Sequence, residues 1–452
     1  MSSLWFETAL LPGGWAKRVR ISAAEGRIDR IEIDTDCADG DERHAIGLPG
    51  MPNLHSHAFQ RGLAGLTERR GPSDDSFWTW RELMYQFVER IDPDELQALT
   101  ALAYLEMLEC GFTHVGEFHY LHHDRGGLPF ADPGELSGRI AAAAVETGIG
   151  LTLLPTLYAH SGFGGREPTK RQRRFVNDRE RFEAIVESSR RIVRGLPGGV
   201  AGVAPHSLRA VSPEELSWLV QLAGNSVIHI HVAEQTQEVE DCIAWSGKRP
   251  IEWLLGNVAL DERWCLVHAT HGAEVELQAV ARAGAVVGLC PITEANLGDG
   301  IFPARQYLQW QGRIGIGSDS NVLLDLAEEL RLLEYSQRLA QHGRNVLAPA
   351  AGASTGRALF TAALEGGARA LRTDASLRAG ALLNAVSLDA AQAALLQKRE
   401  DEILDSWIFA GGRRLVDCVW RAGEKVVSGG RHRQRDAITG RYRRALKRLL
   451  AG

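Results

Sequence analysis

The sequence has few cysteines and none of the paired patterns that indicate a cysteine-based metal or redox site. Six cysteines are spread over 452 residues, and no two of them form a C-x-x-C motif. This spacing excludes a zinc ribbon and a thioredoxin-like redox motif. Buried, reduced thiols are the simpler interpretation, because an isolated cysteine packs as a small hydrophobic residue.

Long apolar runs and an excess of positive charge are also absent. No uninterrupted apolar run reaches about 18 residues, and the first residues lack a basic segment followed by an apolar one. We therefore expect a cytoplasmic protein without membrane contact. The 51 Lys and Arg residues against 57 Asp and Glu residues give a net charge of −6. This balance argues against a nucleic-acid binder and favours work on small molecules.

The chain does contain a regular alternation of strand-like and helix-like segments between residues 45 and 371. One helix start is especially clear, at Asp92, where an N-cap Asp is followed by Pro at the first helical position and by Glu95. Eight strand and helix units over about 325 residues predict a (β/α)8 TIM-like barrel with long insertions. The expected strands are residues 46–53, 113–118, 150–157, 199–205, 227–233, 264–269, 286–290 and 313–318.

Both ends of the chain contain short strand-like pieces, including residues 406–412. We expect the two ends to join in one small composite β-sandwich domain. The predicted boundaries are 1–45 plus 372–430 for this β-domain and 46–371 for the barrel. Residues 162–174, rich in Gly and Arg, are expected to form a mobile loop at the active-site face.

The last segment, residues 431–452, carries eight Lys and Arg residues and one Asp. We predict a basic C-terminal helix or tail that packs through Leu446, Leu449 and Leu450. The alternative is a tail that binds a partner or nucleic acid through its positive charge.

Histidine side chains follow directly on the first expected barrel strand. His55 and His57 are two residues apart, so they point to the same side of the strand and can reach one metal ion. An H-x-H pair is usually only polar surface. Here it stands at the carboxyl end of a strand, where barrel enzymes keep their active sites.

Other expected strands end in residues of the same kind. The fifth strand carries His229 and His231 and is followed by Glu234, the sixth ends at His268, and Asp319 follows the eighth. His231 is a further candidate ligand, and Glu234 would lie within reach of a water on the metal. His229 is expected to be a buried, hydrogen-bonded barrel histidine. Together these residues predict a metal-dependent active site.

Taken together, the motifs resemble the amidohydrolase superfamily, in its aminohydrolase (deaminase) branch. The similar segments, in order, are PGMPNLHSH, VAPHSLRAVSPEEL, IHIHVAE, LVHATH, LCPITEANLGDGIFP and IGSDSN. The resemblance extends over nearly the whole chain. Within the branch, LHSHAFQRGLAGLTER, GEFHYLHHD and CPITEANLGDG look most like the formimidoylglutamate deiminases, whereas guanine and adenosine-type deaminases more often read CPTSN.

The resemblance implies one zinc ion per subunit. Three imidazoles and a carboxylate suit zinc, and water completes such a site. Two-metal members of the superfamily carry a bridging Lys or Glu at the fourth strand, whereas this strand ends in Ala-Pro-His. A single metal is therefore favoured. The implied ligands are His55, His57, His231 and Asp319.

By the same resemblance, Glu234, His268 and Asp319 are the catalytic residues. Asp319 and His268 take the proton of the attacking water or orient it, and Glu234 passes a proton to the nitrogen that leaves as ammonia.

The implied reaction is the hydrolysis of N-formimino-L-glutamate to N-formyl-L-glutamate and ammonia in histidine degradation. A dicarboxylate substrate requires fixed cationic groups away from the metal, and Arg can hold a carboxylate through two parallel N–H bonds. Arg209 and Arg81 are the implied clamp, although a surface or helix-packing role for Arg81 stays open. The implied pocket also includes Gln60, Tyr120 and His206.

Several alternatives remain. A related enzyme could act on a heteroaromatic amine such as guanine or an adenosine derivative, and the aromatic stretch from Phe77 to Phe87 could stack such a ring. A packed helix with Trp78 as a core or interface residue is the preferred interpretation of that stretch. A non-catalytic scaffold is disfavoured because every ligand position is filled. A homodimer is expected only because relatives form one.

Overall fold

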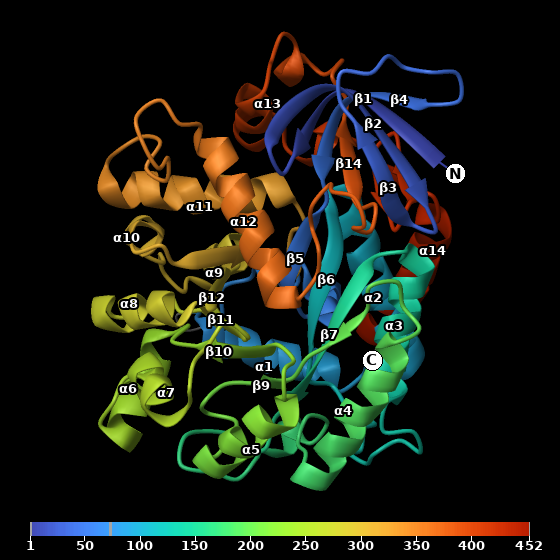
Figure 1. The fold of residues 1–452 in the computed structure, drawn as a ribbon. Coiled ribbons are helices and arrows are strands. Elements are labelled where there is room, and N and C mark those ends of the chain that lie inside the picture. The colour runs from blue at the N-terminus through green and yellow to red at the C-terminus, as the bar shows by residue number, and fades with distance from the viewer. Residues whose placement is uncertain (1, 72–74, 452) are drawn as a thin grey trace.

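The computed structural model describes residues 2–71 and 75–451, and its centre consists of parallel strands (Figure 1). The first parallel sheet contains β5 (Met51–Ser56), β6 (Phe112–His119), β7 (Gly150–Leu157), β8 (Val200–Ala201) and, paired with β7, β9 (Ala204–Pro205). The second contains β10 (Ile228–Val232), β11 (Trp264–His268), β12 (Val286–Leu289) and β13 (Arg313–Ile316). Every residue of β6 and β7 is buried, as expected for strands covered on both faces.

Isolated parallel bridges link these two sheets at both edges. Ser56, at the end of β5, pairs with Asp319, and Ser207 pairs with His231 of β10. The bridges bring the carboxyl ends of strands from both sheets to one place. The parallel strands and the helices between them confirm the predicted TIM-barrel class.

Helices alternate with the strands along the chain. The helix predicted to begin after Asp92 does so, and Asp92 and Glu95 form the expected reciprocal capping box. A 3-10 helix, η1 (Ala58–Leu63), follows β5 directly. The α-helices of this region are α1 (Phe77–Val88), α2 (Pro93–Glu109), α3 (Glu135–Thr147), α4 (Arg179–Val193), α5 (Pro213–Ala223), α6 (Thr236–Ser246), α7 (Pro250–Asn257), α8 (Glu274–Ala283), α9 (Pro291–Leu297), α10 (Ala304–Gln309), α11 (Leu326–Gln341) and α12 (Thr355–Leu371).

The two ends of the chain build one further sheet, which confirms the predicted composite β-domain. Its strands are β1 (Ser2–Leu11), β2 (Gly14–Ala24), β3 (Arg27–Glu32), β4 (Glu42–Pro49), β14 (Ala385–Leu388), β15 (Val416–Arg421), β16 (Glu424–Ser428) and β17 (Arg431–His432). They form a single eight-stranded sheet in which β14 pairs with β4 and β1 lies between β4 and β2. Phe6, Ile21 and Trp420 belong to its own apolar core.

The first expected barrel strand, residues 46–53, is in fact two strands. β4 ends at Pro49 in the composite sheet, and β5 begins at Met51 in the barrel. Gly50 lies between them, where an added Cβ would be 2.3 Å from the side chain of Thr113. The sequence did not reveal this change of sheet, because the apolar stretch is continuous. Its only sign is Gly50, where the backbone passes close to Thr113.

Residues 406–411 are helical, so the prediction of a strand at residues 406–412 was wrong. α13 (Asp401–Ser406) continues into a π-helical turn at Trp407–Gly411. Trp407 is buried, and its ring lies 6.0 Å from that of Phe360 on α12. A short apolar run looks the same in a buried helix and in a strand, so periodicity could not separate the two.

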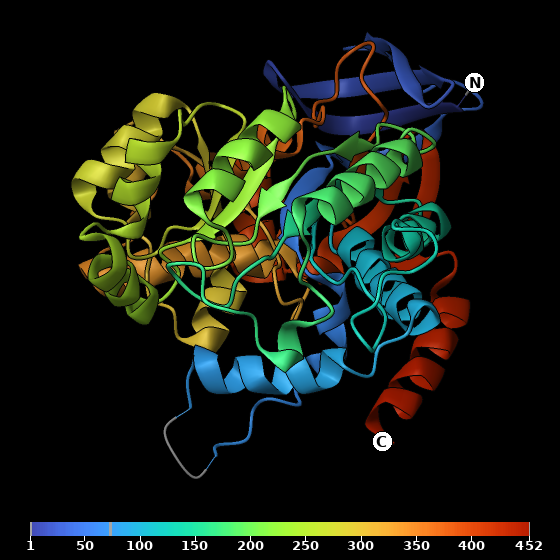
Figure 2. The same ribbon diagram turned by 90° about the horizontal axis from the view of Figure 1, so that it is seen from below.

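The basic tail forms α14 (Arg435–Leu450), which packs along α2 (Figures 1 and 2). Leu449 is buried as predicted, whereas Leu450 is half exposed and does not anchor the helix. Arg435 and Arg448 form ion pairs with Glu109 and Glu95 of α2. These ion pairs neutralise part of the positive charge of the tail within the chain itself.

The loop expected to be mobile, residues 162–174, is fastened at its carboxyl end. Arg174 is almost fully buried and donates hydrogen bonds to the carbonyl oxygens of His123, at 3.0 Å, and Val88. Gln172 donates a 2.7 Å hydrogen bond to the hydroxyl of Tyr158.

Two absences from the sequence have structural counterparts. No helix in the described part of the chain is long and apolar enough to cross a membrane. All six cysteines are free thiols, and all except Cys37 are buried.

Candidate metal centre and adjoining pocket

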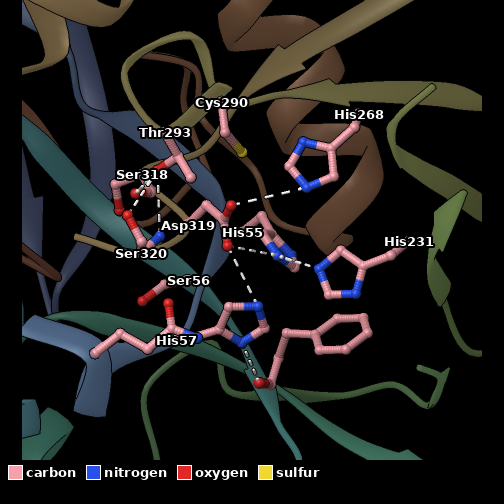
Figure 3. Close-up of polar contacts among 12 residues, drawn as sticks. His55, Ser56, His57, His231, His268, Cys290, Thr293, Ser318, Asp319 and Ser320 are labelled. Atoms are coloured by element: carbon pink, nitrogen blue, oxygen red, sulfur yellow. Dashed lines mark hydrogen bonds and ion pairs between the residues drawn. The ribbon is translucent and has the colours of Figure 1, made fainter. Parts of the chain in front are cut away.

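Four of the predicted residues meet where β5, β10 and β13 end (Figure 3). One nitrogen or oxygen from each of His55, His57, His231 and Asp319 lies within 4.8 Å of the others, and all four side chains are buried. His55 Nε2 is 3.0 Å from His231 Nε2. Asp319 Oδ1 is 3.4 Å from His55 Nε2 and 3.3 Å from His57 Nε2.

Backbone carbonyls orient two of these imidazoles. His57 Nδ1 donates to the carbonyl of Phe118 at 2.9 Å, and His231 Nδ1 donates to that of His206 at 3.1 Å. A proton on Nδ1 leaves the Nε2 lone pair free to face the cluster. His229, on the same strand as His231, instead places Nε2 2.8 Å from the carbonyl of Ala370, as expected for a buried barrel histidine.

The charges of the cluster fit a divalent cation. Burial lowers the pKa of His55 to about 3 and also lowers the pKa of His57 and His231, so all three imidazoles are neutral. Burial raises the pKa of Asp319, but a hydrogen bond from His55 and the charge of His268 help to outweigh it and hold that pKa below its usual range. Three neutral nitrogens and an ionised carboxylate are the deprotonated donors that a metal ion requires.

Backbone strain is concentrated at the same strand ends. Ala233, His268, Ala269, Asp319 and Asn321 all have positive φ angles. Such angles cost about 1–3 kcal/mol each in a non-glycine residue and persist only where the surroundings enforce them.

Two asparagines that the sequence analysis did not single out enforce this geometry. Asn321 Nδ2 donates to Ser56 Oγ and to the carbonyls of His57 and Asp319, at 3.0–3.1 Å. Asn53 bonds Ser318 through both its side-chain oxygen and its side-chain nitrogen. Both residues belong to the motifs quoted above, yet a buried asparagine looks the same in sequence as one in a loop.

The predicted catalytic residues lie on the other side of Asp319. His268 Nε2 is 3.7 Å from both Glu234 Oε1 and Asp319 Oδ2. Burial raises the pKa of Glu234 to about 7. Burial acts against the charged form of His268, but Glu234, Glu294 and Asp319 together raise its pKa well above the usual value. Glu234 can therefore hold or release a proton near neutral pH.

All the predicted substrate-contacting residues line one pocket that opens onto this centre. The pocket joins Gln60, Arg81, Tyr120, His206 and Arg209 to the candidate ligands His57, His231 and Asp319 and to the catalytic candidates Glu234 and His268. Gln60 Nε2 donates to the Tyr120 hydroxyl at 3.0 Å.

The two arginines of the pocket have no ion-pair partner among the described residues. The Nε atoms of Arg81 and Arg209 are buried without a hydrogen bond there. Trp78 makes cation–π contacts in addition to its packing role. The guanidinium carbons of Arg81 and Arg209 lie 4.5 and 5.5 Å from the centre of its ring. Arg209 is buried and Arg81 is partly buried, and neither guanidinium group forms an ion pair there, so this part of the pocket suits an anionic ligand.

The family model described as Amidohydrolase family matches residues 46–426. The chain belongs to the amidohydrolase family. A second model, described as Formimidoylglutamate deiminase HutF, N-terminal domain, matches residues 1–45. The chain is 51% identical over 436 residues to the formimidoylglutamate deiminase of Pseudomonas aeruginosa, covering 96% of each chain. It is 30% identical to a 5-methylthioadenosine/S-adenosylhomocysteine deaminase of Natronomonas pharaonis, covering 77% of this chain and 75% of that protein.

Solved structures agree on the fold. An amidohydrolase from Brucella melitensis superposes with a TM-score of 0.96 at 54% identity, covering 100% of both chains. An adenosine deaminase from Xanthomonas campestris with bound zinc gives a TM-score of 0.82 at 23% identity, covering 100% of this chain and 98% of that one. Because the sequence identity to this deaminase is low, the match supports the fold alone.

Proposed function

We propose that the chain is a zinc-dependent formimidoylglutamate deiminase, which hydrolyses N-formimino-L-glutamate to N-formyl-L-glutamate and ammonia in histidine degradation. The observation that carries the proposal is the pair of unpaired arginines on Trp78, in the same pocket as a His, His, His, Asp cluster. The 51% identity to the Pseudomonas aeruginosa enzyme of that name supports it.

The reaction needs an activated water and a route for two protons. When held by His55, His57, His231 and Asp319, zinc supplies the Lewis acidity that makes a water nucleophilic near neutral pH. Asp319 Oδ2 and His268 Nε2 lie 3.7 Å apart; the carboxylate takes up the proton of the water, and the protonated imidazole orients the water.

The water oxygen forms a bond to the amidine carbon, and the C=N double bond becomes a single bond. Glu234, whose pKa of about 7 suits proton transfer, delivers a proton to the nitrogen. As the C–N bond breaks, the new hydroxyl group gives up its proton, which Glu234 passes to the same nitrogen, so that ammonia leaves and the formyl C=O double bond forms. The proton taken from the water at the start returns to Glu234.

The far end of the pocket accounts for the two carboxylates of the substrate. Arg81 and Arg209 each offer a planar set of N–H donors, and neither forms an ion pair with a carboxylate among the described residues. A neutral heteroaromatic amine would leave the buried guanidinium group of Arg209 and the partly buried one of Arg81 without an anionic partner, which is costly. The pocket therefore favours a diacid over guanine or an adenosine derivative.

A panel assay of ammonia release tests the proposal. The substrates are N-formimino-L-glutamate, N-formiminoglycine with one carboxylate, guanine and 5′-methylthioadenosine. The diacid should be turned over with the highest kcat/KM. Turnover of guanine or the adenosine derivative in preference to the diacid would support the alternative substrate class instead.

The same assay on an Arg209→Ala variant tests the clamp. Loss of a buried charge pair costs about 2–4 kcal/mol, so KM for the diacid should rise by roughly 30-fold or more. Arg179→Ala is the matched control, because Arg179 also stacks on a tryptophan, Trp218 at 5.5 Å, but outside this pocket. An unchanged KM in the Arg209 variant would exclude the clamp.

A further inference from the structure

Asp319 turns its two carboxylate oxygens to two different sets of donors (Figure 3). Oδ1 faces His55 and His57, whereas Oδ2 lies 3.7 Å from His268 Nε2. A second group of potential ligands therefore adjoins the first. One donor atom from each of His268, Cys290 and Asp319 lies within 4.8 Å of the others, and all three side chains are buried.

His268 offers this second group an unused nitrogen. Its Nε2 atom is buried and makes no hydrogen bond within residues 2–71 and 75–451. Its other nitrogen, Nδ1, donates to Glu294 Oε1 at 3.1 Å. A carboxylate behind the distal nitrogen fixes the ring and directs the opposite nitrogen outward, as it does behind metal-binding histidines.

Glu294 connects two of the three donor residues, His268 and Cys290, to each other. The same Oε1 atom accepts a 2.9 Å hydrogen bond from the backbone nitrogen of Cys290. His268 ends β11, Cys290 follows β12 and Asp319 follows β13, so three adjacent strand ends present the set. In Figure 3 the sulfur of Cys290 points toward the gap between Asp319 and His268.

We propose that His268 Nε2, Cys290 Sγ and Asp319 Oδ2 form a second, inhibitory site for a divalent cation such as zinc. Sulfur, imidazole and carboxylate donors suit zinc and cobalt and do not suit magnesium or calcium. Asp319 bridges this ion and the first one.

Binding changes no oxidation state. The thiol of Cys290 and Nε2 of His268 release their protons to solvent, and sulfur and nitrogen each donate an electron pair to the ion. This second ion binds more weakly than the first, because a buried thiol must lose its proton. The inhibition rests on the proposed function, since the ion occupies the Asp319 and His268 atoms that handle the water proton.

Cobalt reports on the site directly. Holoenzyme with one Co²⁺ per chain is titrated with further Co²⁺ while metal content, absorption and ammonia release are followed. A near-ultraviolet sulfur-to-cobalt charge-transfer band should grow with the second equivalent and saturate at two ions per chain. Activity should fall in parallel with the band.

Two variants identify the sulfur. Cys290→Ala should keep the first ion and its activity but lose the band and the inhibition. Cys265→Ala removes a neighbouring thiol that is equally buried, and this variant should keep both the band and the inhibition. If Cys290→Ala does not fold, Cys290→Ser keeps the side-chain volume and should still lose the band.

Each of the following results would overturn the proposal: no band with the second equivalent, a band that persists without Cys290, or inhibition that develops without a band. A band lost in Cys418→Ala would also do so, because Cys418 belongs to a separate cluster with Glu42 and His44. The band and the stoichiometry need no substrate. They decide the site even if formiminoglutamate is not turned over.

Discussion

His55 Nε2 lies 3.0 Å from His231 Nε2, although 176 residues separate the two histidines in the chain. Two imidazole lone pairs at this distance repel one another unless a proton or a metal ion lies between them. Asp319 Oδ1 approaches the same point and supplies negative charge. This is the arrangement expected of a metal site, and each strand end contributes one part of it.

His231→Ala should remove most of the bound metal. Three remaining ligands bind zinc much more weakly than four, so the metal content should fall from about one ion per chain to a small fraction. His229→Ala is the matched control on the same strand, because His229 bonds the carbonyl of Ala370 and not the cluster. Elemental analysis after dialysis measures the metal content of both variants. Equal metal loss in the two variants would contradict the ligand assignment.

Glu234→Gln should separate metal binding from turnover. The amide keeps the size of the side chain but cannot deliver a proton, so kcat should fall by about 10²–10⁴-fold while the metal content stays unchanged. Steady-state ammonia release together with elemental analysis checks this. Near-normal activity would remove Glu234 from proton transfer.

Trp78→Leu should raise KM for the diacid more than it lowers kcat. The ring lies against both guanidinium groups, and each cation–π contact contributes about 0.5–1 kcal/mol, so loss of the two contacts should raise KM by roughly 5–30-fold. Trp78→Phe should restore part of the loss, since a smaller ring keeps the contact. Trp218→Leu, beneath Arg179, should leave KM unchanged. A fall in kcat alone would indicate that Trp78 acts elsewhere.

Glu117 should make the stability of the protein depend on pH. It is fully buried on β6, where it accepts hydrogen bonds from the Ala58 backbone nitrogen at 2.7 Å and from the Tyr104 hydroxyl at 3.1 Å. Burial raises the pKa of its carboxyl to about 8, whereas an unfolded Glu has a pKa near 4.3.

The unfolded chain therefore loses this proton at a lower pH than the folded one. Between roughly pH 4.3 and 8 the free energy of unfolding falls as pH rises, by at most about 1.4 kcal/mol per pH unit. Glu117→Gln removes this contribution, so its stability relative to the unmodified protein should improve from pH 5.5 to pH 7.5. Thermal unfolding at both pH values measures the difference, and a constant difference would show that Glu117 is already ionised.

Much of the fold followed from local patterns. The strand periodicity located the parallel strands to within a few residues, and the Asp92 cap located α2. The errors lay where a local pattern has two meanings. The apolar run at residues 406–412 would suit either a strand or a buried helix. It is helical around Trp407, which packs against Phe360.

The sequence by itself determined the chemistry at the strand ends, because strand alternation puts His55 and His57 on one side and the resemblance identified their partners. Only the tertiary structure decided how those ends meet: that Asp319 faces two groups of donors, that Asn321 ties β5 to the residues after β13, and that Arg81 joins Arg209 on Trp78. The physical reason is that periodicity acts over a few residues. Contacts across hundreds of residues depend on how the strands and helices pack.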